Sequence, residues 1–144
     1  MTKMKNESFM KTILVTGGAG FIGSNFTEIA LQKGYKVIVL DSFTYAGHDA
    51  SLEFAKGNAN FTLVKGNICD TKLVNNLLQK HGCDAVINFA AESHVDNSIN
   101  SPGVFINTNI VGVYSMLEAA RAYFMELPED KKQAFRFIQV STDE

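Results

Sequence analysis

Residues 11–23 have the sequence KTILVTGGAGFIG, and this stretch decides the fold class. Its first six residues, 11–16, form a short apolar run rich in β-branched side chains, which predicts a buried strand. Gly17, Gly20 and Gly23 follow at once, and their GxxGxxG spacing is a variant of the dinucleotide-binding fingerprint. Glycines are needed there because a side chain would keep backbone N–H groups away from a pyrophosphate. The position of the loop between a strand and a helix makes this signal strong.

Short apolar runs elsewhere in the chain predict four more strands, the first of them buried. They lie at 36–40, 61–64, 84–89 and 135–140. These runs are apolar throughout rather than alternating, which is typical of a parallel sheet that helices cover on both faces.

Helical periodicity fills three of the intervals between the strands. After the glycine loop, the stripe predicted to face the sheet consists of Ile22, Phe26, Ile29 and Ala30. A second helix is expected after an N-cap at Asp70, with the apolar stripe Leu73, Val74, Leu77 and Leu78. Ser101 as a cap and Pro102 as the first helical residue predict a long helix to about Phe124. The charged stretch 126–132 is expected to be a solvated loop.

This alternation predicts an α/β fold, a doubly wound parallel sheet of the Rossmann type that stops after about the fifth strand. In such sheets, ligands bind beyond the carboxyl ends of the strands. Residues 1–10 are polar and lack the apolar core of a signal peptide, so we expect a flexible tail there or an alternative start.

Asp41 stands at the end of the second predicted strand. A carboxylate in that place accepts hydrogen bonds from both ribose hydroxyls of NAD and repels the extra phosphate of NADP. An ordinary turn or helix cap is the alternative interpretation of this residue. We therefore predict NAD as the cofactor and residues 11–144 as an incomplete NAD-binding Rossmann domain.

Composition excludes several other classes of protein. The 144 residues are 46% apolar and 19% charged, which suits one globular domain. A net charge of only −2 without a basic stripe argues against nucleic acid as the partner, and no apolar run is long enough to predict a membrane span. Cys69 and Cys83 are isolated, so we expect reduced thiols in a cytoplasmic protein, with no disulfide and no metal site.

Four segments carry a resemblance to a known family. The loop GGAGFIGS at 17–24 resembles the extended short-chain dehydrogenase/reductase family, which includes many nucleotide-sugar epimerases and dehydratases. DSFTYAG at 41–47, FAAESHVD at 89–96 and STDE at 141–144 are similar to the dTDP-glucose 4,6-dehydratases within it. These matches run along essentially the whole chain after residue 11, and the last two are far more specific than the glycine loop.

The resemblance implies which residues hold the cofactor. Residues 41–44 would line the adenosine ribose, 67–68 would flank the adenine, and 89–93 would run under the second ribose and the nicotinamide. The implied cofactor-binding residues are Gly17, Gly20, Phe21, Ile22, Gly23, Asp41, Ser42, Phe43, Thr44, Asn67, Ile68, Phe89, Ala90, Ala91, Glu92, Ser93 and Thr108.

The resemblance also implies a sugar site at the end of the fifth strand. Ser93, His94 and Thr142 would contact the substrate, with Thr142 holding the 4-oxygen of the sugar. Asp143 would be the general acid and Glu144 the general base, whereas related epimerases usually have a non-acidic pair in this place. Two adjacent carboxyls at the end of a buried strand are costly, and removing a proton while protonating a leaving hydroxyl needs one acid and one base. Without the resemblance, an ordinary loop or helix start explains these residues as well.

The chain departs from the family pattern in places. The family usually has an acid where Asn67 stands and an arginine where Asn97 stands. It also requires a Tyr-x-x-x-Lys pair. The residues four places after Tyr35, Tyr45, Tyr114 and Tyr123 are Val39, Asp49, Glu118 and Leu127.

We therefore expect the tyrosine–lysine pair beyond Glu144, together with the last sheet strands and the sugar-nucleotide domain. The chain alone is expected to be an inactive fragment with an uncovered sheet edge.

The resemblance implies an NAD-dependent lyase that converts dTDP-glucose to dTDP-4-keto-6-deoxyglucose in deoxysugar biosynthesis. It further implies a homodimer that uses the helix at 101–124. Two alternatives stay open: another nucleotide-sugar dehydratase, decarboxylase or epimerase of the same family, and a non-catalytic NAD-binding module.

Overall fold

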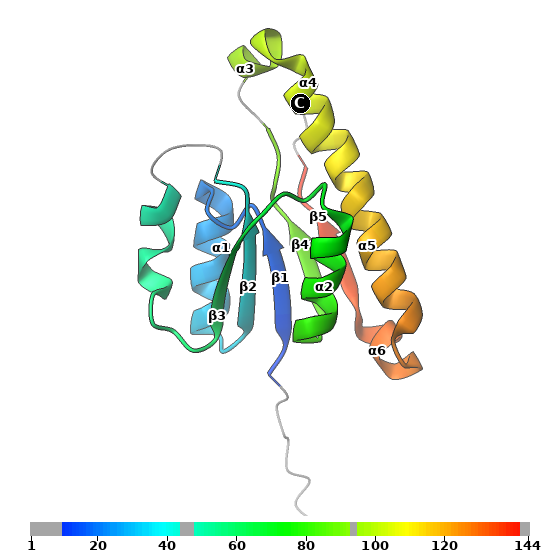
Figure 1. The fold of residues 1–144 in the computed structure, drawn as a ribbon. Helices are drawn as coiled ribbons and strands as arrows, with labels where there is room; N and C mark the ends of the chain where they lie inside the picture. Colours follow the sequence, from blue (N-terminus) through cyan, green and yellow to red (C-terminus); the bar gives the residue numbers. More distant parts are fainter. Residues whose placement is uncertain (1–9, 44–47, 93–94, 142–144) are drawn as a thin grey trace, which may run out of the picture.

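Figure 1 shows the fold in a computed structural model, which describes residues 10–43, 48–92 and 95–141. Five parallel strands form one sheet in the order β3-β2-β1-β4-β5. The strands are β1 (Thr12–Thr16), β2 (Lys36–Asp41), β3 (Phe61–Lys65), β4 (Ala85–Asn88) and β5 (Arg136–Gln139). The chain runs outward from β1 to β3 and then returns to the other side of β1. The predicted doubly wound sheet is therefore confirmed, and its strand order reverses between β1 and β4, where such folds bind ligands.

Helices cover both faces of the sheet. One face carries α1 (Phe21–Gln32) and the 3-10 segment η1 (His48–Ala55), and the other carries α2 (Thr71–His81) and α5 (Val113–Glu126). Successive residues of a strand point to opposite faces, so Leu14 packs with the α2–α5 layer while Val15 packs on the α1 side. All five residues of β1 are buried, which makes this strand the centre of the core.

The long helix that packs beside α2 consists of three consecutive segments. It comprises α4 (Pro102–Ile106), a π-helical turn η2 (Asn107–Gly112) and α5, and the short helix α3 (Val95–Asn100) precedes it. In Figure 1, α3 and α4 extend beyond the end of the sheet. Ser101 occupies the N-cap position and Pro102 the first turn, as predicted, although the Ser101 side chain makes no capping hydrogen bond.

The prediction for α2 is confirmed. The Asp70 carboxylate accepts a hydrogen bond from the Leu73 N–H at 3.0 Å, and Gly82 ends the helix in the left-handed conformation with φ of 58°.

The stripe predicted for α1 is wrong in part. Ile22 and Ile29 are exposed, with 62% and 52% of their surface accessible, whereas Gly23, Thr27 and Ala30 face the sheet. The reason is the close approach of the helix to the loop that precedes it. A Cβ on Gly23 would collide with the Gly17 carbonyl oxygen, so only small side chains fit on the buried face.

The predicted solvated loop at 126–132 is also wrong, because α6 (Glu129–Ala134) forms there. Acidic residues occupy its first turn and Lys131 and Lys132 lie in its last turn, which suits the helix dipole at both ends. Phe135, directly after the helix, packs its ring 5.6 Å from that of Tyr123. Charge and aromatic packing thus order a segment that has no buried residue of its own.

Both cysteines are free thiols. No helix among the described residues is long and apolar enough to cross a membrane. Within the same residues, no group of three or more His, Cys, Asp or Glu side chains is placed to hold a metal ion.

Replacing Gly23 with alanine should destabilise the protein by about 1–3 kcal/mol, because the added methyl group overpacks the contact with the glycine loop. Gly103 is the matched control, since it is also helical and a Cβ there meets nothing within 4 Å. Gly103→Ala should be neutral or stabilising by up to ~1 kcal/mol. Thermal unfolding measures both, and equal effects of the two substitutions would contradict the packing described here.

Native-state labelling should separate the two cysteines. Burial, assisted by the charge of Asp84, raises the pKa of the Cys83 thiol to about 12, so the reactive thiolate is scarce at neutral and mildly alkaline pH. Cys83 is also only 2% exposed, whereas Cys69 is partly exposed. With a thiol reagent at pH 8, peptide mass spectrometry should find Cys69 modified first and Cys83 modified only on unfolding. Rapid labelling of Cys83 in the folded protein would contradict its burial.

Candidate cofactor and active site

The glycine loop lies against the end of β4. Gly17 has φ of +68°, and a Cβ on it would fall 2.6 Å from the Ala90 nitrogen. Its own N–H donates to the Leu40 carbonyl at 2.9 Å, which ties the loop to β2. The ends of β1, β2 and β4 therefore meet at one glycine, at the edge where doubly wound sheets bind ligands.

The N-terminus of α1 opens at this same edge. Gly20 precedes the helix and provides no side-chain cap, and the first turn of any helix has N–H groups without acceptors in the helix. Such a turn, preceded by glycines, is suited to a pyrophosphate. Phe21, which is 86% exposed, and Ile22 flank this helix start.

Asp41 is held against the glycine loop by its carboxylate. Oδ2 accepts a hydrogen bond from the Ala19 N–H at 2.9 Å, and Oδ1 accepts one from the Phe43 N–H at 2.8 Å. The second bond bends the chain so sharply that Phe43 takes φ of 52°, a left-handed conformation uncommon outside glycine. Each carboxylate oxygen keeps acceptor capacity for a further donor, so these contacts are compatible with the predicted bonds to ribose hydroxyls.

The predicted adenine residues have different surroundings. Asn67 is exposed, and its side-chain oxygen accepts a hydrogen bond from the Cys69 N–H at 2.8 Å. Ile68 is buried and its side chain packs against Gly112 of η2 in the α2–α5 core. Asn67 thus lies at the surface of the loop, while Ile68 anchors the loop from beneath.

The segment after β4 runs beside the π-helical turn. The Asn109 side chain accepts from the Glu92 N–H at 2.9 Å and donates to the Glu92 carbonyl at 2.9 Å. Thr108, which is half-buried, stands next to Asn109 in the turn. The structure therefore brings the predicted cofactor residues of 89–92 close to the turn that carries Thr108.

A chain of polar side chains crosses the sheet just below this edge. The Thr16 hydroxyl donates to the Asn88 side-chain oxygen, and Asn88 Nδ2 donates to Gln139 Oε1 at 2.7 Å. These residues are register partners on β1, β4 and β5, so their side chains share one face of the sheet. Thr16 and Asn88 are fully buried, so both need the partners they have.

Sequence reasoning missed this chain. The available signal was the presence of a polar residue near the carboxyl end of each of three otherwise apolar runs.

Six of the predicted site residues lie outside the described part of the chain. They are Thr44, Ser93, His94, Thr142, Asp143 and Glu144. Their roles remain predictions, as do the ligand contacts of the described residues.

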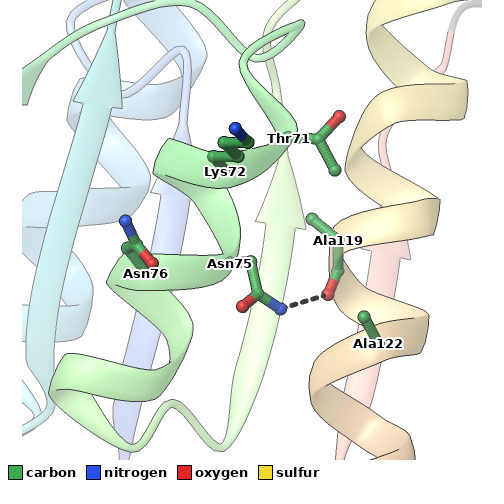
Figure 2. A pocket seen from close by; sticks show the side chains of 6 residues that line it. All are labelled: Thr71, Lys72, Asn75, Asn76, Ala119 and Ala122. Atoms are coloured by element: carbon green, nitrogen blue, oxygen red, sulfur yellow. Dashed lines mark hydrogen bonds between the residues drawn. The ribbon is translucent and has the colours of Figure 1, made fainter.

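A separate shallow groove of about 320 Å³ lies between α2 and α5. Figure 2 shows Asn75 of α2 pointing across to α5, where its Nδ2 donates to the Ala119 carbonyl at 3.2 Å. The lining residues are Thr71, Lys72, Asn75, Asn76, Ala119 and Ala122. None of them is a predicted site residue, so this groove is distinct from the edge that carries the candidate site.

Known proteins are similar to this chain in both sequence and fold. A dTDP-glucose 4,6-dehydratase of Xanthomonas campestris pv. campestris (strain B100) is 56% identical over 135 residues, which are 94% of this chain and 38% of that protein. The crystal structure of dTDP-glucose 4,6-dehydratase from Bacillus anthracis, in complex with NAD, superposes with a TM-score of 0.74 at 36% identity, over 92% of this chain and 38% of that one. The enzyme of the same name from Streptomyces venezuelae, solved with NAD and TYD bound, gives 0.73 at 44% identity, over 78% and 36%.

These findings confirm the predicted resemblance, and the chain spans about two fifths of the length of the relatives it matches. A family model described as GDP-mannose 4,6 dehydratase matches residues 14–144. On that match, which covers the described sheet and helix layers together, the chain belongs to the GDP-mannose 4,6 dehydratase family.

Proposed function

We propose that this chain is the cofactor-binding part of an NAD-dependent enzyme that converts dTDP-glucose to dTDP-4-keto-6-deoxyglucose. The observation that carries the proposal is the 56% identity to a dTDP-glucose 4,6-dehydratase along 94% of the chain. The relatives from Bacillus anthracis and Streptomyces venezuelae that share the fold were both solved with NAD. The substrate and reaction are those that the names of these relatives give, and this chain carries the sequence STDE at 141–144, which resembles the motif of the family.

The described residues fit NAD at three places. The glycine loop and the N-terminus of α1 suit the pyrophosphate, because the first helical turn has no side-chain cap. The absence of side chains at Gly17 and Gly23 lets the loop pack closely against β4 and α1. Asp41, held beside that loop, is placed to accept ribose hydroxyls and to repel a 2′-phosphate. The segment 89–92 and Thr108 would line the nicotinamide end. When bound, NAD supplies a hydride acceptor and, later in the cycle, a hydride donor.

The chemistry at the sugar is assigned to the segment after β5. Thr142 would donate a hydrogen bond to the oxygen on C4, and a ketone at C4 would make the C5 proton acidic. Glu144 would then remove the C5 proton while Asp143 protonates the departing C6 oxygen, which leaves as water. These assignments rest on the resemblance. The hydrogen bond between Asn88 and Gln139 holds the end of β5, after which this segment follows in the sequence.

We further propose a cytoplasmic homodimer that uses the long helix. Ile106, Ile110, Tyr114 and Leu117 are exposed and recur at helical spacing along α4, η2 and α5. An exposed apolar stripe of this kind is typical of a surface that another helix covers.

The proposed reaction is tested by a product assay on the natural protein that contains this chain. The protein is incubated with NAD and, separately, with dTDP-glucose, UDP-glucose and GDP-mannose, and mass spectrometry follows each sugar nucleotide. Loss of one water from dTDP-glucose alone is the expected result. Dehydration of a different sugar nucleotide would contradict the proposal, and so would an epimer, which chromatography before the mass measurement would separate from the substrate. Bound NAD with no turnover of any sugar would favour a non-catalytic module.

Replacing Glu144 with glutamine should block elimination without weakening NAD binding, because the amide keeps the size of the side chain but cannot take a proton. We expect dehydration to fall by about 10²–10⁴-fold, the usual contribution of a general base. The absorbance of reduced nicotinamide should rise on mixing with dTDP-glucose, since the first oxidation still proceeds. Glu129→Gln is a matched control, because it changes the same functional group on an exposed residue of α6 that belongs to no predicted site. Normal turnover by Glu144→Gln would refute the assignment of the base.

A further inference from the structure

The π-helical turn η2 interrupts a helical stretch that is otherwise α-helical from Pro102 to Glu126. A π turn is rare because each of its hydrogen bonds spans one residue more than in an α-helix, and such turns often occur at functional sites. The extra residue also shifts the direction of all following side chains by about 100° around the helix axis. In this protein, the turn contacts two loops that sequence reasoning assigned to opposite ends of the cofactor.

The first of these contacts is made by Asn109. Its side-chain amide both accepts from and donates to the backbone of Glu92, with 2.9 Å for each bond. Two hydrogen bonds to one residue fix the orientation of that peptide segment as well as its position. Asn109 therefore fixes the end of the segment 89–92, the part of the chain predicted to run under the second ribose and the nicotinamide.

The second contact is made by the two ends of the turn with the loop after β3. Gly112 leaves room for Ile68, since a Cβ on it would lie 2.5 Å from Ile68 Cδ1. At the other end, the Asn107 carbonyl accepts a hydrogen bond from the Cys69 thiol at 3.6 Å.

One turn further on, Ser115 donates its hydroxyl hydrogen to the Cys69 carbonyl at 3.0 Å and lies 2.6 Å from the Thr71 hydroxyl. The loop predicted to flank the adenine is thus attached to η2 and to the first turn of α5.

We propose that η2 is a joint that sets the separation of the two ends of the NAD site, with Asn109 as the positioning residue for the nicotinamide end. Asn109 does so through the backbone of Glu92. The proposal rests on the proposed binding of NAD. NAD spans both ends of the site, whereas ADP occupies only the adenosine end. Loss of the hydrogen bonds between Asn109 and Glu92 should therefore weaken the binding of NAD more than that of ADP.

The test compares Asn109→Leu with Asn75→Leu in the natural protein that contains this chain. Asn75 of α2 is the matched control, because its amide also makes a hydrogen bond with the backbone of the long helix, at the Ala119 carbonyl. Asn75 lines the groove between α2 and α5, away from the candidate site. Dissociation constants for NAD and for ADP are measured by isothermal titration calorimetry. Thermal unfolding without ligand is recorded for every variant.

For Asn109→Leu we expect the Kd of NAD to rise ~10-fold, the effect of losing one or two net hydrogen bonds, while the Kd of ADP changes less than ~2-fold. Asn109→Asp keeps the acceptor for the Glu92 N–H but loses the donor, so it should give a smaller rise in the Kd of NAD. Asn75→Leu should leave both constants unchanged. If Asn109→Leu is too unstable to purify, Asn109→Asp still tests the proposal by the same comparison of NAD with ADP.

Unchanged NAD affinity in both Asn109 variants would overturn the proposal, and so would an equal loss of NAD and ADP binding. The same rise in Asn75→Leu would also overturn it, because a general loosening of the helix layer would then explain the effect. Failure of the unmodified protein to bind NAD is a separate outcome, which would refute the proposed function itself.

Discussion

The carboxyl edge of the sheet depends on one close contact, the approach of Gly17 to the backbone of Phe89 and Ala90. A Cβ at residue 17 would lie 2.6 Å from the Ala90 nitrogen and 2.8 Å from the Phe89 carbonyl carbon, so no other residue fits. The positive φ of Gly17 turns the chain away from β1 at once, and this turn leads into α1. Gly23 repeats the constraint from the other side, since its missing side chain lets α1 begin directly against the loop. The loop that forms the candidate phosphate site can pack this closely only because residues 17 and 23 have no side chain.

The polar groups at this edge are arranged around that contact. Asp41 reaches the loop from β2 through the Ala19 N–H, and Asn88 reaches β1 and β5 through Thr16 and Gln139. Both interactions link strands or loops that the sheet itself already holds in register. These side-chain hydrogen bonds add to the backbone hydrogen bonds of the sheet, and they restrict the positions of the chain segments that follow the strands. Satisfied polar networks of this kind favour a single arrangement over several similar ones.

Much of the fold follows from local sequence patterns, since five continuous apolar runs and a glycine loop between a strand and a helix define the sheet. The helices were harder to predict, for identifiable reasons. The buried face of α1 is formed by Gly23, Thr27 and Ala30 because space there is limiting, whereas hydrophobicity alone selects Ile22 and Ile29. The helix α6 depends on charges at its ends and on the packing of Phe135, neither of which gives apolar periodicity. No pattern in the sequence predicts the π turn, and its observed contacts, those of Asn109 and Gly112, are with distant loops. For the site, motif spacing located the loop and Asp41, but it did not reveal the buried pair of Thr16 and Asn88.

The two hydrogen bonds of Asp41 have a consequence for protein engineering. The acid at the end of the second strand is the obvious position at which to change the cofactor preference of such a domain. Here the same carboxylate also supports the glycine loop through Ala19 and the left-handed turn at Phe43. Its removal would therefore leave the N–H groups of Ala19 and Phe43 without their acceptors. It would weaken the support of the glycine loop as well as the proposed contact with the ribose. A substitution at residue 41 alone therefore changes both the support of the loop and the preference for NAD over NADP, so a redesign has to replace both functions.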